Sequence, residues 1–319
     1  MEHNNERKIV VAIDYGTSKT CVSHALYEPS SADMSEIILV RFDGNDSTPS
    51  TVTYDDNGDI VWGKQAKNLA SGGYTWTKIL LDENQRHEGF QSTLVSDASK
   101  AFFVRPESTE CQALIIDFLA RPHTYILDGL VNNYSSLALP VEYWFTVPAV
   151  WKDKTLGLMK EAINAAGYTT RPQDSIWAIS EAEAASLSIW KQLPVDVKTD
   201  GQFLLVDCGG GTTDLTSFRA DDTFRGRSYE QGMATAGLHC GGAEVDWRFA
   251  TYLEKYMSKP YREGLQDAQD FRQFMLEVKD LKNRFFRQGG AQVSPLASLC
   301  GPQSGHNKNN HTTGDRSDR

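Results

Sequence analysis

Two stretches decide the fold: IVVAIDYGTSKTCVSHAL at residues 9–26 and QFLLVDCGGGTTDLTSF at residues 202–218. Each consists of an apolar run, an aspartate, a glycine-bearing turn rich in hydroxyl side chains, and a second run with strand character. Apolar runs that flank such a turn are typical of β-hairpins. The chain therefore predicts two similar hairpins, far apart in sequence, which we expect to face each other across a cleft.

Both turns carry residue types that bind phosphate groups. Glycines let the backbone approach a phosphate closely and expose its N–H groups, and neighbouring hydroxyls add donors. These positions are Gly16, Thr17 and Ser18 in the first turn and Gly209, Gly210, Gly211, Thr212 and Thr213 in the second. Either turn alone also fits an ordinary hairpin. The two together, in this order, favour a site for the phosphates of a nucleotide.

Asp14 and Asp207 end the first strand of each hairpin at equivalent places. Two carboxylates repel a triphosphate unless a divalent cation lies between them, and Mg²⁺, which keeps most of its waters, is suited to that position. We therefore expect both aspartates to bind Mg²⁺ through water, and one of them to orient or deprotonate an attacking water. Lys78, in TWTKILLD, is a candidate to offset charge on the γ-phosphate.

The composition excludes several other classes of protein. A chain of 319 residues with 40% hydrophobic residues can bury a sizeable core, and we expect two lobes. The formal net charge of −10 argues against a nucleic-acid partner, which would need clustered Lys and Arg. The 5 cysteines are widely spaced without a CxxC pair, so neither a disulfide framework nor a zinc site is expected.

The sequence indicates no targeting or membrane segment. The first residues, MEHNNERK, are polar and lack the apolar core of a signal peptide. No apolar run is long enough for a transmembrane helix. We expect a soluble, cytoplasmic protein without a membrane partner.

Hydrophobic periodicity predicts alternating strands and helices. Strands are expected at residues 8–14, 20–27, 36–41, 142–147, 176–180, 202–207, 213–219 and 225–235. Helices are expected at residues 110–133, 152–168, 181–192 and 265–287, and from about Ala243 onward. In the second of these, Leu156, Met159 and Ile163 recur at helical spacing, and Gly167 suits the position after the helix.

These elements predict an α/β fold in two parts. Residues 1–195 would form lobe I, with an inserted subdomain at about 42–110, and residues 196–288 would form part of lobe II. Residues 193–201 resemble a linker between the lobes. Residues 289–319 lack periodicity and are rich in Gly, Ser, Asn and Asp, which predicts a disordered tail.

The ordered set of motifs resembles the 70-kDa heat-shock protein family, within the actin-like ATPase superfamily. IDYGTSKT and VDCGGGTTD resemble its two phosphate motifs, and FTVPAVW followed by ISEAEAAS resembles its connecting segment. GLHCGGAEVD is similar to the glycine-rich segment of the second lobe, and WGKQAK with TWTKILL to the stretch that holds the catalytic lysine. The resemblance covers residues 8–285 and implies duplicated, ribonuclease H-like α/β subdomains.

The resemblance implies a role for each matching position. Asp14, Thr17 and Asp207 would lie at the metal and phosphate site, and Lys78 and Glu181 around the γ-phosphate and the attacking water. Residues 209–212 would hold the phosphates from lobe II, with Gly241 and Gly242 near the ribose. Simpler alternatives are a solvated lysine at position 78 and, for Glu181, an acid that only stabilises a helix dipole. Cys208 is expected to be a small core residue.

The sequence departs from the family in two respects. Tyr15, Ser18, Ala182 and Glu183 resemble a divergent branch related to the twelfth heat-shock-70 subfamily. The chain also lacks the further helices and second glycine motif of the family's lobe II, so that lobe is expected to be truncated. The helix at 265–287 then offers Glu277, Lys279, Lys282 and Arg284 toward adenosine, and apolar residues of strands 202–207 and 213–219 would lose their cover.

Three functions remain open from the sequence. The first is an ATPase domain that binds ATP or ADP with Mg²⁺ and couples hydrolysis to a chaperone-type conformational change, with client proteins or co-chaperones as partners. The second is a catalytically inactive nucleotide-binding or interaction module, favoured by the short lobe II. The third is a small-molecule kinase on the same fold. It is disfavoured because no motif marks the aspartate that would act as its base.

Overall fold

The structure is a computed structural model of the chain. It describes residues 6–29, 35–69, 72–82, 106, 110–134, 138–190, 202–221, 228–231, 236–238, 241–256 and 267–288. The expected linker at 193–201 and the expected tail at 289–319 lie outside these residues, as does much of the expected inserted subdomain.

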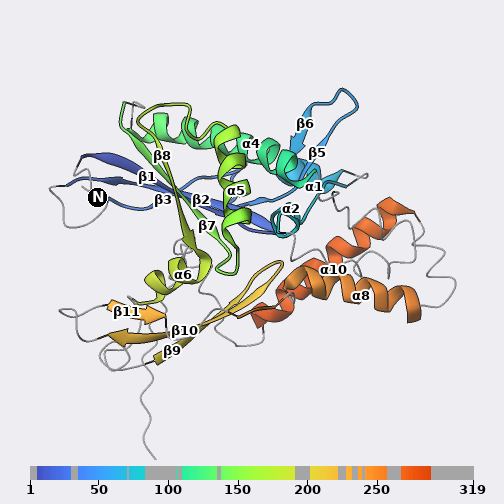
Figure 1. The fold of residues 1–319 in the computed structure, drawn as a ribbon. Coiled ribbons are helices and arrows are strands. Elements are labelled where there is room, and N and C mark those ends of the chain that lie inside the picture. Colours follow the sequence, from blue (N-terminus) through green and yellow to red (C-terminus); the bar gives the residue numbers. More distant parts are fainter. Residues whose placement is uncertain are drawn as a thin grey trace, which may run out of the picture.

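A six-stranded mixed sheet, here called the larger sheet, forms the upper half of the molecule in Figure 1. Its strands are β1 (Lys8–Tyr15), β2 (Lys19–Tyr27), β3 (Ile38–Leu39), β4 (Thr48–Pro49), β7 (Val141–Val147) and β8 (Ser175–Ser180). β1 and β2 form the first predicted hairpin, and β1, β7 and β8 run parallel to one another. The strands expected at 8–14, 20–27, 142–147 and 176–180 are confirmed, and the strand expected at 36–41 is reduced to two residues.

Two helices pack on one face of the larger sheet: α4 (Cys111–Tyr134) and α5 (Asp153–Ala165). Alternate residues of β1 and β7 point to this face because side chains in a strand alternate. Ile13, Phe145, Phe118 and Met159, each at most 1% exposed, represent the four elements in one continuous core. Both helices agree with the sequence prediction. The glycine expected after α5, Gly167, has φ +100.

A small hairpin and two short helices lie beside this core. They are β5 (Val52–Tyr54), β6 (Ile60–Trp62), α1 (Gly63–Asn68) and α2 (Thr77–Leu80). Val52 and Leu81 are buried in the core cluster, and Trp62 packs against it. The segment is therefore tied to the larger sheet through its apolar side chains.

The smaller sheet occupies the lower half of Figure 1 and contains the second predicted hairpin. It consists of β9 (Gln202–Cys208), β10 (Thr213–Asp221), β11 (Ser228–Gln231) and β12 (Ala236–Leu238). The other three strands each pair with β10 in antiparallel orientation. Helix α6 (Glu181–Trp190) lies between the two sheets, and its Ala182 and Ala185 pack on Leu205 and Phe218. The strand expected at 225–235 is confirmed only in part, as β11.

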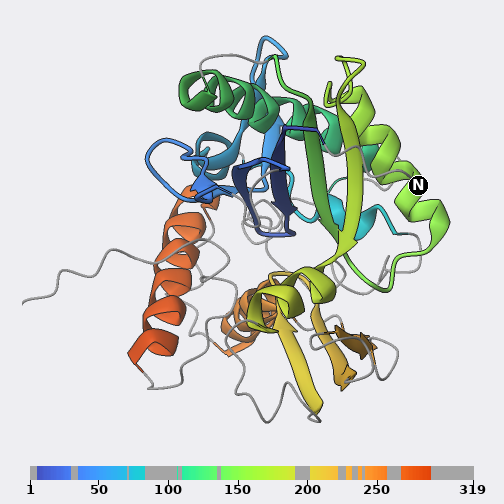
Figure 2. The same ribbon diagram turned by 90° about the vertical axis from the view of Figure 1, so that its left-hand side faces the viewer.

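Helices α8 (Gly242–Tyr256) and α10 (Ala268–Gln288) complete the described chain. They pack together through Ala250, Phe271 and Met275. In Figure 2, α10 extends from the lower half toward the upper half. There Arg272 Nη1 donates to the carbonyl of Lys67 in α1 at 3.1 Å. No helix of the described ranges is both long and apolar enough to cross a membrane.

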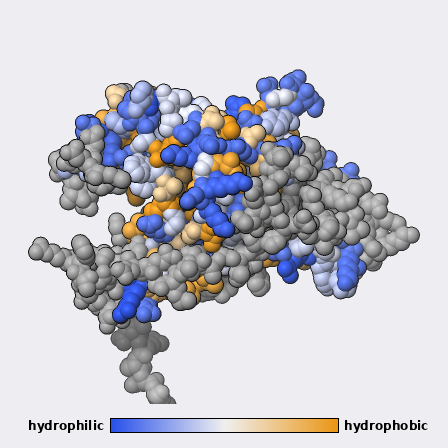
Figure 3. Space-filling model, viewed as in Figure 1, coloured by the Kyte–Doolittle hydropathy of each residue, from blue (hydrophilic) through white to orange (hydrophobic). Residues whose placement is uncertain are grey.

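One face of β9 lacks cover from the described residues. Leu204 is 61% exposed and Val206 is 48% exposed, as expected for this strand. In Figure 3, only a small area of hydrophobic atoms is visible in the lower half of the molecule, which contains β9 and β10. Cys208 lies on the same face and is exposed, so the expectation of a core cysteine is wrong. Strand alternation explains the error, because Phe203 and Leu205 turn toward α6 while every second residue points away from it.

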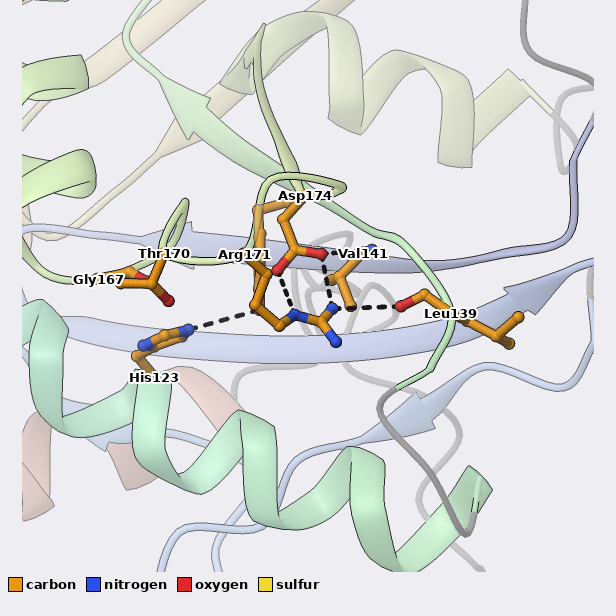
Figure 4. A network of polar contacts seen from close by, with 8 residues as sticks. His123, Leu139, Val141, Gly167, Thr170, Arg171 and Asp174 are labelled. Carbon is orange, nitrogen blue, oxygen red and sulfur yellow. Dashed lines mark hydrogen bonds and ion pairs between the residues drawn. The ribbon is translucent and has the colours of Figure 1, made fainter.

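A polar network joins the residues at the beginnings of β7 and β8 (Figure 4). Arg171 donates to Asp174 through Nε at 2.8 Å and through Nη2 at 2.6 Å, and Nη2 also donates to the carbonyl of Leu139 at 3.2 Å. Asp174 Oδ1 accepts the amide of Val141 at 3.0 Å. Because Val141 begins β7 and Asp174 immediately precedes β8, this network fixes the register of the parallel pair far from the glycine turns.

Replacing Phe118 with Ala tests the core between α4 and the sheet. Phe118 is 1% exposed and packs against Tyr15 in a tilted arrangement, with ring centroids 5.5 Å apart. We expect the free energy of unfolding to fall by about 3–5 kcal/mol, since the variant loses buried apolar surface and leaves a cavity. Urea denaturation measures this change. The matched control is Ile37→Ala, which alters a residue that is 66% exposed, and a shift within about 0.5 kcal/mol is expected there.

Candidate functional site

The first hairpin turns at Gly16. The Gly16 amide donates to the carbonyl of Lys19 at 3.1 Å, and a Cβ at position 16 would lie 2.7 Å from that same oxygen. The turn therefore needs glycine. Two residues before Gly16, Asp14 Oδ1 accepts a hydrogen bond of 2.7 Å from Thr146 Oγ1 on β7. The parallel pairing of β1 with β7 holds this carboxylate at the end of the strand.

The second hairpin turns through three glycines and is docked on the start of α8. The carbonyls of residues 209, 210 and 211 accept hydrogen bonds from the amides of residues 242, 243 and 241, at 3.0, 2.8 and 3.2 Å. These amides lie at a helix N-terminus, where N–H groups lack partners within the helix. The glycine turn and α8 therefore form one unit.

The two hairpins touch. A Cβ on Gly210 would lie 1.9 Å from Ser18 Oγ, and one on Gly211 would lie 2.0 Å from Ile79 Cδ1 and 2.8 Å from Thr17 Oγ1. A Cβ on Gly241 would lie 2.5 Å from the backbone of Gly211. Contact between the two parts of the chain thus depends on glycine at these positions, and it brings together turn residues that are distant in sequence.

Lys78 and Glu181 form a buried ion pair at this junction. Lys78 Nζ lies 2.5 Å from Glu181 Oε1, and the side chains are 3% and 20% exposed. The ammonium also donates to the carbonyl of Thr146 at 3.4 Å, and lies 6.0 Å from the ring centroid of Tyr15 and 5.8 Å from that of Trp151. Lys78 is therefore not a solvated lysine. Glu181 begins α6, and it has this specific partner in addition to its place in the first turn of the helix.

Asp207 lies in a concentration of negative charge. Burial, followed by repulsion from Glu181, Asp214 and Asp14, raises the pKa of Asp207 to about 6, and Lys78 opposes this shift. Its Oδ1 is buried and has no hydrogen-bond partner. A carboxylate oxygen in this condition is destabilised, so a positive charge placed beside it would be bound favourably.

The donor set fits a hydrated divalent cation. Asp14 and Asp207 are hard oxygen ligands of the kind that Mg²⁺ prefers, and the orphaned Oδ1 of Asp207 is available. Among the described residues, no group of three or more His, Cys, Asp or Glu side chains is arranged to hold a metal directly. The expected arrangement, in which two aspartates reach the cation through water, needs no such group and stays a prediction.

A second charged cluster lies where α10 meets α8. Lys282 Nζ is 2.5 Å from Asp246 Oδ1 and donates to the carbonyl of Gly242 at 3.0 Å, and Lys279 Nζ is 3.6 Å from Asp246 Oδ2. Burial lowers the pKa of Lys279 to about 8, with Asp246 opposing the shift, and burial also lowers the pKa of Lys67. Lys279 and Lys282 were both expected to face adenosine. Lys282 contacts Gly242 and Asp246, whereas Lys279 contacts Asp246. Glu277 is exposed, and the side chain of Arg284 is outside the described set.

Most residues predicted for the site are brought together by the structure. Gly210 meets Ser18, Gly211 meets Thr17, and Lys78 meets Glu181. Thr212 Oγ1 donates to Asp214 Oδ2 at 2.8 Å instead of pointing to the first hairpin, and Thr213 pairs with Cys208 in the sheet. Sequence reasoning missed Tyr15, Thr77, Thr146, Trp151 and Asp214. Only Asp214 had a clear signal, as the acid that ends GGGTTD.

Substitution of Gly210 by Ala tests the contact between the hairpins. The new Cβ would clash with the Ser18 side chain, so we expect a loss of about 1–3 kcal/mol in the free energy of unfolding. Amides 241–243 should also exchange hydrogen faster, because their acceptors belong to the displaced turn. Gly157→Ala in α5 is the control, since its Cβ would meet nothing within 4 Å, and this variant should be as stable as the parent or more stable. Equal stability of the Gly210 variant would contradict the contact.

Two chaperones are similar to this chain. Chaperone protein DnaK of Buchnera aphidicola subsp. Schizaphis graminum is 24% identical over 263 residues, which is 78% of this chain and 38% of DnaK. Heat shock 70 kDa protein 6, chloroplastic, of Arabidopsis thaliana is 27% identical over 276 residues, which is 82% of this chain and 34% of that protein. The chain spans little more than a third of the length of these curated relatives. No family model matches it.

The fold and these relatives agree with each other. The mixed sheet with its covering helices has the α/β architecture of an actin-like ATPase lobe, so the predicted fold class is confirmed. The closer relation to the twelfth heat-shock-70 subfamily stays a prediction. At the level of the family, the distant similarity to DnaK and to a chloroplastic Hsp70 supports the 70-kDa heat-shock proteins as the relatives of this chain.

Proposed function

We propose that the chain is an ATP-binding, heat-shock-70-like ATPase domain that hydrolyses ATP in the presence of Mg²⁺. The observation that carries the proposal is the meeting of the two glycine hairpins, because it gathers Asp14, Asp207, Lys78 and Glu181 around one junction. The lobe boundaries expected from the sequence, and the coupling of hydrolysis to a chaperone-type conformational change with client or co-chaperone partners, are part of the same proposal. The cytoplasmic location stays a prediction.

In this proposal the turns hold the phosphates. Backbone N–H groups of residues 16–18 and 209–212 would bind the phosphate oxygens, aided by the hydroxyls of Thr17, Ser18 and Thr212. Gly241 and Gly242 would lie toward the ribose. Asp14 and Asp207 would hold hydrated Mg²⁺, which neutralises phosphate charge when bound.

The remaining groups would act on the γ-phosphate and the attacking water. The Lys78 ammonium, held by Glu181, would stabilise negative charge on the transferred phosphoryl group. Asp207 would accept the proton of the attacking water at its unpartnered Oδ1. A carboxylate with a pKa near 6 is better suited to this step than an ordinary aspartate, because its pKa lies closer to neutral pH.

Calorimetric titration of the full chain with ATP and ADP, with and without Mg²⁺, tests the proposed site. Wild type should bind in a magnesium-dependent manner. Asp207→Ala should bind at least about tenfold more weakly in the presence of Mg²⁺, which corresponds to the loss of one strong charged interaction. Asp153→Ala removes an exposed aspartate at the start of α5 and should bind like wild type.

Hydrolysis is then followed in the same preparations by phosphate release. Binding together with turnover supports the ATPase. Magnesium-dependent binding without turnover would replace it by the nonhydrolytic nucleotide-binding module, and phosphoryl transfer to a sugar would favour a kinase. A folded chain that binds neither nucleotide would overturn the proposal.

The pKa of Asp207 predicts a pH dependence of metal-assisted binding. Its folded-state pKa of about 6 lies above the ordinary 3.8, so the carboxyl gains a proton as the pH falls through 6. Because a metal ligand must be deprotonated, the magnesium-dependent part of the ATP affinity should fall about tenfold between about pH 7.5 and about pH 5. Calorimetric titration with ATP at several pH values, with and without Mg²⁺, measures this change in affinity. Asp207→Asn should show weak magnesium dependence and no such decline, and a flat wild-type profile would argue against this role.

A further inference from the structure

Lys78 is carried by a helix that cannot hold its own position. α2 has four residues, all buried, and a single helical turn is unstable without contacts to its surroundings. Trp76, immediately before it, has φ 70, in the left-handed region that is unfavourable for a bulky residue. A conformation of this kind persists only where neighbouring groups enforce it.

Tyr15 reaches the beginning of α2 from the larger sheet. Its hydroxyl lies 2.6 Å from Oγ1 of Thr77, the residue that begins α2 and immediately precedes Lys78. Tyr15 is 0% exposed and Thr77 is 3% exposed, so this hydrogen bond is shielded from water. Burial raises the pKa of Tyr15, and the hydroxyl stays protonated. A buried pair of this kind is costly to break, because each hydroxyl would lose its partner without gaining solvent.

Tyr15 also links this bond to the first hairpin. It is the last residue of β1 and follows Asp14 directly, while its ring packs on Phe118 and lies 6.0 Å from the Lys78 ammonium. The strand that carries the Asp14 carboxylate therefore also carries the group that anchors the Lys78 helix.

We propose that Tyr15 is a positioning residue, which fixes Lys78 relative to Asp14 through its hydrogen bond to Thr77. The inference rests on the proposed function, since it assumes that Lys78 acts on the γ-phosphate. Glu181 and the carbonyl of Thr146 hold the end of the lysine side chain, and the Tyr15–Thr77 bond holds its backbone. Loss of the Tyr15 hydroxyl leaves the ion pair between Lys78 and Glu181 in place, but the backbone of Lys78 is then less firmly held.

Four variants of the full chain isolate this bond. Tyr15→Phe keeps the ring and removes the hydroxyl, and Thr77→Val removes the other partner at nearly equal volume. Thr77→Ser keeps a hydroxyl and should restore the wild-type behaviour. Tyr168→Phe is the matched control, because Tyr168 is also 0% exposed in the same core and donates to the carbonyl of Leu119 at 3.2 Å.

The first readout needs no nucleotide. Pulse labelling of the ligand-free chain with an amine reagent, followed by mass spectrometry, reports how well Lys78 is held, with exposed Lys19 as the internal standard. Lys78 should label about two- to tenfold faster in Tyr15→Phe and Thr77→Val, the range equivalent to one neutral hydrogen bond. A fifth variant that combines Tyr15→Phe with Thr77→Val should label at the same rate as either single variant, since both substitutions remove the same bond. Thr77→Ser and Tyr168→Phe should match wild type.

The second readout is the ATPase reaction. Misplacement of a catalytic group lowers the rate of the chemical step, so kcat should fall about tenfold to a hundredfold in Tyr15→Phe while KM for ATP stays unchanged. A wild-type chain without turnover would refute the proposed function, and the labelling result would still decide the positioning role. Unchanged Lys78 labelling in Tyr15→Phe overturns that role whatever the activity. Thr77→Val decides the question if Tyr15→Phe does not fold.

Discussion

The absence of side chains at Gly210 and Gly211 is the constraint on which the rest of the site depends. A single Cβ at either position would collide with Ser18 or with Ile79, so the two hairpins could not meet. The same turn offers its carbonyls to the first amides of α8, and any displacement would therefore also move that helix. Glycine here is required for the contact between two parts of the chain as well as for a phosphate to approach.

The described residues contain two clusters of charge. Carboxylates are in excess in the first cluster, and lysines are in excess in the second. Burial raises the pKa of Asp207, and repulsion from the carboxylates of Glu181, Asp214 and Asp14 raises it further, against the opposing ammonium of Lys78. Where α8 meets α10, Lys279 and Lys282 lie beside the carboxylate of Asp246. Burial lowers the pKa of Lys279, and repulsion from Lys67 and Lys282 lowers it further. Within the described residues, the charges of neither cluster are balanced. A magnesium nucleotide supplies a cation suited to the first of them, which is why the proposed function agrees with the electrostatics.

Sequence patterns predicted the larger elements well, because periodicity over many residues reflects which face is buried. α4 was expected at 110–133 and observed at Cys111–Tyr134, although Pro122 lies within it, so its buried face outweighs the local cost of proline. Local residue type was a poorer guide. Cys208 is exposed because strand register overrides the usual burial of cysteine. The pairing of Lys78 with Glu181 was implied only by family resemblance, and the contacts of Tyr15 and Thr146 join residues too distant in sequence for any spacing rule.

The position of Lys78 follows from the topology of the larger sheet. β1, β7 and β8 are parallel neighbours, so their carboxyl ends meet at one edge. Tyr15 closes β1, Thr146 lies near the end of β7, and Glu181 comes directly after β8, and each of them contacts Lys78 or the residue before it. Ligands of α/β sheets commonly bind outside the carboxyl ends of the strands. The lysine is therefore held by three strands whose order is fixed by the core. That explains how a four-residue helix, with a left-handed residue before it, can carry a group that the proposed chemistry requires in one place.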